Sequence, residues 1–116
     1  MNLKIFNFLE IAAKTATHRK DERSFLLGSI GIRSDGKLVK AFNSPSEFPD
    51  RTAHSEFRLS KKLDYGATVY VARVRLQDGQ FGMSRPCFNC MKVLKSKKVK
   101  RIYYTISAGE FGIIDL

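Results

Sequence analysis

The 116-residue sequence predicts a three-layer α/β/α domain, with helices on both faces of a mixed sheet of about five strands. The main observation is the order of the patterns along the chain: a helix, two strands, a helix, a strand, a helix and a strand. Strands that alternate with helices are typical of a sheet that is covered on both faces. The length suits one hydrophobic core. We therefore expect a single domain over residues 1–116.

The N-terminal part of the chain predicts a helix and a β-hairpin. Residues 3–17 carry apolar side chains at three- and four-residue intervals, which is the stripe of an amphipathic helix. The runs 25–33 and 37–43 are β-prone, and Ser34-Asp35-Gly36 separates them. Because Asp-Gly supplies the positive φ angles of a tight turn, we expect the two runs to pair antiparallel.

The central part predicts a loop, a short helix and a strand. Residues 44–53 contain two prolines and several other turn formers, which indicates a loop. From His54 onward, Phe57 and Leu63 lie near one helical face and basic residues largely on another. Residues 67–76 alternate and are rich in valine, which favours a strand.

The C-terminal part predicts a helix over 87–98, after a Gly-containing loop and Pro86, and a strand over 100–106. Only about four residues separate this strand from the apolar FGII near the end of the chain, whereas parallel strands need a crossover of about a dozen residues. Any last strand should therefore pair antiparallel with the strand before it.

The composition limits the partners and the compartment. Lys and Arg number 21 against 11 acidic residues, and the net charge of +10 either attracts anions such as phosphate or nucleic acid or serves solubility. No stretch approaches the roughly 20 apolar residues that cross a bilayer, and the N-terminus lacks the apolar core of a signal peptide. The two cysteines are too close in sequence for a stabilising disulfide. We expect a cytoplasmic protein without a membrane partner.

Cys87 and Cys90 are spaced i, i+3 at a predicted helix start, so they face the same side one turn apart. Zinc–thiolate bonds of about 2.3 Å at tetrahedral angles need sulfurs roughly 3.7 Å apart, which this turn can provide. The same spacing also serves thiol–disulfide exchange or a closed structural zinc site. The cysteine pair alone therefore indicates zinc without excluding the other two interpretations.

A catalytic zinc site normally has three protein ligands and a fourth position for water. Of the two histidines, His18 lies in the charged cluster HRKDER and is typical of a surface histidine. His54, like Cys87, lies at a predicted helix start, and two helix starts can converge on one point. Glu56, in the first turn after His54, can reach the water position, where a carboxylate carries protons.

These residues form the pattern H-x-E…P-C-x-x-C, as His54-Ser55-Glu56 and Pro86-Cys87-Phe88-Asn89-Cys90. From about residue 25 onward the sequence resembles the cytidine deaminase-like superfamily. The resemblance implies a cytidine deaminase-like fold, Zn²⁺ held by His54, Cys87 and Cys90, and Glu56 as the general acid–base. The expected reaction replaces the exocyclic amine of a cytosine-type base with oxygen and releases ammonia.

The resemblance also implies substrate contacts. Ser55 stands where the family usually has alanine, whose backbone N–H holds the substrate carbonyl. Asn43 matches an asparagine that binds the sugar, although a turn role before Pro45 is an equal alternative. Arg85 occupies the position whose backbone carbonyl accepts the exocyclic amine. Phe88 is a candidate base contact, but packing in the core is the preferred interpretation.

The substrate class stays open between two alternatives. The short antiparallel end resembles free cytidine deaminases and favours a pyrimidine nucleoside or nucleotide. The charge favours a deaminase of cytosine or adenine in single-stranded DNA or RNA, with basic residues concentrated at Lys92, Lys95, Lys97, Lys98, Lys100 and Arg101. A non-catalytic zinc module is the third alternative, which the intact Glu56 disfavours. Assembly into a homo-oligomer is also left open.

Overall fold

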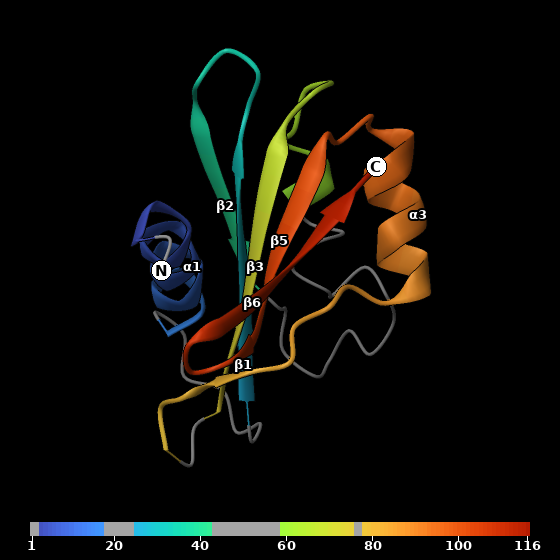
Figure 1. The fold of residues 1–116 in the computed structure, drawn as a ribbon. Helices are drawn as coiled ribbons and strands as arrows, with labels where there is room; N and C mark the ends of the chain where they lie inside the picture. Colours follow the sequence, from blue (N-terminus) through green and yellow to red (C-terminus); the bar gives the residue numbers. More distant parts are fainter. Residues whose placement is uncertain (1–2, 18–24, 43–58, 76–77) are drawn as a thin grey trace.

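The computed structural model describes residues 3–17, 25–42, 59–75 and 78–116. Figure 1 shows its helices and strands. They are α1 (Leu3–Thr17), β1 (Phe25–Ile32), β2 (Leu38–Phe42), β3 (Thr68–Arg75), β4 (Phe81–Gly82), α3 (Phe88–Ser96), β5 (Arg101–Ser107) and β6 (Glu110–Asp115).

The strands form one mixed sheet of order β2-β1-β3-β5-β6, with β4 paired to the end of β3. β3 and β5 are parallel, and α3 lies in the connection between them, as a parallel pair requires. β6 pairs antiparallel with β5 after a turn of two residues. The predicted mixed sheet and its antiparallel last strand are confirmed.

The sheet separates two buried clusters, and a helix covers each face. α1 packs on one face with Ile30, Tyr70 and Ala72, while Leu94 of α3 packs on the other with Val69. Figure 1 shows α1 and α3 on opposite sides of the sheet. Successive side chains of a strand point to opposite faces, so β3 contributes alternate residues to the two clusters. The predicted three-layer arrangement is confirmed.

The predicted turn at Asp35-Gly36 joins β1 to β2. Gly36 has φ +88°, a conformation that glycine adopts without a Cβ penalty. Its N–H donates to the Arg33 carbonyl at 2.8 Å, and the Lys37 N–H donates to the Asp35 carboxylate at 3.0 Å. These bonds close the hairpin and set the register Ile32↔Leu38.

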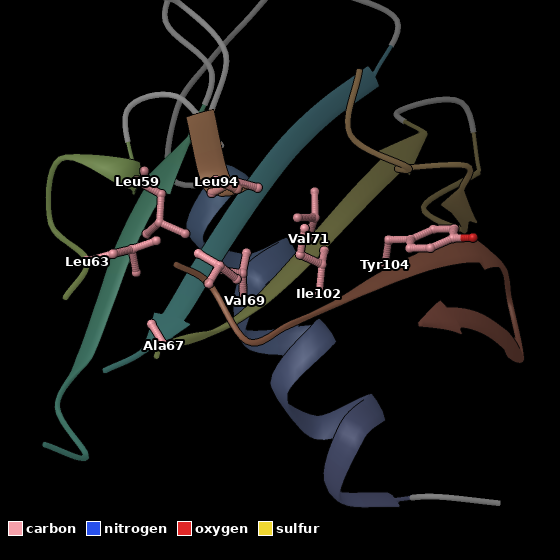
Figure 2. Packing of buried hydrophobic residues seen from close by; sticks show 10 residues of the cluster. Leu59, Leu63, Ala67, Val69, Val71, Leu94, Ile102 and Tyr104 are labelled. Atoms are coloured by element: carbon pink, nitrogen blue, oxygen red, sulfur yellow. The ribbon is translucent and has the colours of Figure 1, made fainter. Parts of the chain in front are cut away.

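The predicted helix from His54 is described only at its end. Leu59 and Ser60 are helical, Leu59 and Leu63 are buried, and Lys61 and Lys62 are exposed. The separation of apolar and basic residues is therefore confirmed for this part, while Phe57 lies outside the described residues. Figure 2 shows Leu59 and Leu63 in the buried cluster that also contains Leu94.

One strand, β4, was not predicted, because two residues in a Gly-containing stretch carry no detectable period.

The position of β4 explains how the cysteine loop, residues 83–87, begins. The parallel ladder between β3 and β5 ends at Val71↔Tyr104. β1 occupies the other edge of β3 along its whole length, so β4, which pairs with β3 at Arg73↔Gly82, lies on the β5 side. Ser84 then donates its N–H to the Thr105 carbonyl of β5 at 2.9 Å. The chain therefore enters a fork between the diverging ends of β3 and β5.

Two buried hydroxyl groups connect the strands at this fork. The Ser84 hydroxyl donates to the Val71 carbonyl at 2.9 Å and accepts the Thr105 N–H at 2.7 Å. The Thr105 hydroxyl donates to the Gly82 carbonyl at 2.7 Å and accepts the Arg73 N–H at 3.2 Å. These bonds satisfy backbone groups that the interrupted ladder would leave unpaired. They fix the chain three residues before Cys87.

We expect Ser84→Ala to lower the free energy of unfolding by about 1–3 kcal/mol, because it leaves a buried carbonyl and a buried N–H without partners. Urea denaturation measures the loss. Ser29→Ala is a matched control, since Ser29 is fully buried in β1 and its hydroxyl has no hydrogen-bond partner among the described residues. Equal losses in the two variants would contradict the role of the Ser84 bonds.

Candidate metal centre

The two cysteines lie at the start of α3, directly after the fork. Cys87 is the N-cap residue, with an extended backbone (φ −69°, ψ 167°), and its carbonyl accepts the Met91 N–H at 2.9 Å. Cys90 lies in the first turn. The helix does not extend further toward the N-terminus, because Pro86 disfavours helical geometry in the residue before it, Arg85.

This pair fits one half of a zinc site. Cys90 is 1% exposed and Cys87 is exposed, so the pair lies at the boundary between the core and the surface. Thiolates are preferred zinc ligands, and the partial positive charge at a helix N-terminus favours anionic ligands. The donor chemistry and the position therefore suit a zinc ion that solvent can reach.

The other predicted site residues, His54, Ser55, Glu56 and Asn43, lie outside the described residues, and their roles stay predictions. Within the described ranges, no group of three or more His, Cys, Asp and Glu residues could hold a metal ion. The described residue nearest in sequence to this motif is Leu59, which shares a buried cluster with Leu94 of α3. The chain that follows the His54 motif thus packs on the face that carries α3.

Arg85 is exposed on the cysteine loop, and its side chain turns toward β5. Its Nη1 donates to the Tyr104 hydroxyl at 3.3 Å, and its guanidinium carbon lies 5.8 Å from the centroid of that ring. Tyr104 lies across Gly112 of β6, where a Cβ atom would be 2.2 Å from the ring. This contact orients the loop residue whose carbonyl is predicted to accept the substrate amine. No sequence pattern signalled it.

Phe88 does not pack in the core, so the preferred interpretation from the sequence is wrong. It is 76% exposed, and Lys92 places its Nζ 5.4 Å from the ring centroid. The reason is helical geometry: Cys90 and Leu94, four residues apart, occupy the buried side of α3, which leaves Phe88 and Lys92 on the solvent side. The exposed ring agrees with the alternative of a substrate contact.

Comparison with a solved structure defines the fold class. The crystal structure of cytidine deaminase from Burkholderia pseudomallei is similar to this chain with a TM-score of 0.70 and 16% sequence identity. The similarity covers 95% of this chain and 91% of that chain. At this identity the likeness shows the fold, which is that of a cytidine deaminase. No curated protein matches the chain in sequence.

The family follows from the sequence match. The family model described as the cytidine and deoxycytidylate deaminase zinc-binding region matches residues 4–106. The chain therefore belongs to the cytidine and deoxycytidylate deaminase family, and the predicted resemblance is confirmed. The match spans both halves of the predicted motif, from His54 to Cys90.

Proposed function

We propose that this protein is a zinc-dependent hydrolase that deaminates a cytosine-type base in a nucleoside or nucleotide. The observation that carries the proposal is the cysteine pair in the first turn of α3, at the fork of the parallel strands. In open α/β sheets, ligands bind at the carboxyl ends of strands, where neighbouring connections diverge. Cys87 and Cys90 follow such a point.

In this proposal His54, Cys87 and Cys90 hold the zinc ion. When bound, the ion acts as a Lewis acid that lowers the pKa of water to about 7. The water oxygen forms a bond to the ring carbon that bears the amino group, while Glu56 accepts a proton from this water and delivers it to the ring nitrogen. Glu56 then transfers the remaining proton of the added hydroxyl to the amino group, which leaves as ammonia while the C–N bond breaks. The products are the uracil form of the base and ammonia.

The antiparallel β5–β6 pair favours a small substrate, because this arrangement resembles that of free cytidine deaminases. Two observations favour the second candidate, deamination in single-stranded nucleic acid. Phe88 is an exposed ring beside the cysteines, and exposed aromatic rings stack bases. Four of the predicted basic residues are exposed at or after α3, namely Lys92, Lys95, Lys98 and Lys100.

Ammonia release from deoxycytidine, deoxycytidine monophosphate and a cytosine-containing oligonucleotide tests the function and separates the two candidates. We expect turnover of at least one free compound, with a shallow dependence on salt. Activity on the oligonucleotide alone would favour the second candidate, provided that replacing Lys95, Lys97 and Lys98 flattens a steep salt dependence. Each phosphate contact contributes about −0.7 to the slope of log affinity against log salt for single strands. No ammonia from any compound would contradict deamination of cytosine.

A further inference from the structure

An open groove of about 470 Å³ lies beside the cysteine loop. The ends of β3 and β4 and the turn between β5 and β6 line it, and its polar lining side chains are Arg73, Arg75, Gln80 and Ser107. Met83, four residues before Cys87, lines it as well and is exposed. Ligand pockets commonly have volumes of roughly 300–1,000 Å³, so the groove has room for a nucleotide-sized group.

The two arginines project from the sheet face that α3 covers. They continue the alternation of Val69 and Val71 along β3, and these valines pack in the cluster that contains Leu94. The groove therefore opens on the same side of the sheet as the cysteine-bearing helix.

Gly82 brings the two arginine side chains together. A Cβ atom at Gly82 would lie 3.5 Å from Cγ of Arg75 and 3.6 Å from Cδ of Arg73, so both aliphatic stems pack over this glycine. Nη1 of Arg73 also donates to the Met83 carbonyl at 3.5 Å. The arginines are thus held side by side along the groove.

The charged side chains that line the groove are two arginines. None of the described residues that line it is acidic. Asp78 lies next to it and pairs with Arg75 through two contacts, Nε with Oδ1 at 3.3 Å and Nη2 with Oδ2. The Gln80 backbone N–H and then Arg75 lower the pKa of this carboxyl. At the other end, Glu110 accepts the Ser107 hydroxyl at 3.1 Å. Asp78 balances the charge of Arg75, and Arg73 is the second guanidinium group of the lining.

We propose that this groove binds a phosphate group of the substrate, in a subsite next to the metal centre. The proposal rests on the proposed function. Guanidinium groups bind phosphate oxygens through paired, charge-assisted hydrogen bonds, and the Gln80 amide and the Ser107 hydroxyl add neutral donors. The phosphate belongs either to a mononucleotide or to the backbone of a single strand, since both present the same oxygens.

The test is the double variant Arg73→Gln/Arg75→Gln in the zinc-loaded full chain. Lys4→Gln/Lys14→Gln is the matched control, because it removes two positive charges from exposed positions of α1 on the opposite face of the sheet. Calorimetry measures binding of deoxycytidine, its monophosphate and a cytosine-containing oligonucleotide without relying on turnover, and kcat/KM is measured in parallel.

We expect wild type to bind at least one phosphate-bearing compound more tightly than deoxycytidine, and the groove variant to weaken that binding roughly 10- to 100-fold while deoxycytidine is unaffected. Weaker binding of the monophosphate by the groove variant identifies a mononucleotide subsite, and weaker binding of the oligonucleotide alone identifies a strand contact. The proposal is overturned if wild type binds the phosphate-bearing compounds no more tightly than deoxycytidine, or if the groove variant binds all three compounds equally more weakly. It is also overturned if the control variant loses as much affinity as the groove variant. A protein that releases no ammonia contradicts the proposed function, while the binding data still decide the groove.

Discussion

Glu56→Gln is expected to lower kcat by more than roughly a hundredfold while zinc content and fold are kept. The amide has nearly the shape of the carboxylate but cannot carry a proton between the water, the ring nitrogen and the leaving amine. Steady-state ammonia release measures the loss, and elemental analysis and thermal unfolding show that the site and the fold persist.

Glu10→Gln provides the matched control, because Glu10 is an exposed glutamate on α1, which covers the other face of the sheet. It should retain the turnover of the wild type. A Glu56→Gln protein with most of its turnover would remove Glu56 from the mechanism, and the redox and structural-zinc interpretations of the cysteine pair would return.

Substitution of either cysteine is expected to reduce zinc from one equivalent per chain to less than half, as measured by elemental analysis of protein purified without chelator. Metal binding is coupled to folding, so chelation should lower the melting temperature of the wild type and leave that of Cys87→Ser unchanged. Phe88→Ala is the control, because Phe88 lies between the cysteines and is exposed.

The two cysteines differ in burial, so their substitutions should differ in their effect on stability. Cys90 is 1% exposed on the buried side of α3, whereas Cys87 is exposed. Cys90→Ala should therefore cost packing energy in addition to the metal, and Cys87→Ala should cost the metal alone. Less than half an equivalent of zinc in the wild type, unchanged in Cys87→Ala, would refute the site.

Local patterns were enough to predict most of the described elements. The predicted helix over 3–17 coincides with α1, and the predicted strands agree with β1, β2, β3 and β5 to within one residue at each end. These predictions succeed because side-chain periodicity and turn residues act over a few neighbouring positions. The antiparallel β6 was also predictable, since a short connection cannot make a parallel crossover.

Half of the candidate site could also be anticipated. The i, i+3 spacing predicted that Cys87 and Cys90 share one turn, and the structure places them in the first turn of α3. Phe88 was misplaced because its hydrophobicity suggested burial, while the helix phase set by Cys90 and Leu94 turns it to solvent. The joining of His54 and Glu56 to the cysteines stays a prediction.

The sequence by itself determined the order of the elements other than β4, the family and the residues that suit zinc chemistry, because these are properties of short motifs and their spacing. Only the tertiary structure decided that β4 enters the fork between β3 and β5, that Ser84 and Thr105 bond there, and that Arg73 and Arg75 lie together over Gly82. The physical reason is distance along the chain. Ser84 and Thr105 are 21 residues apart in sequence, so no local period relates them, and their contact exists only once the sheet has brought the strands together.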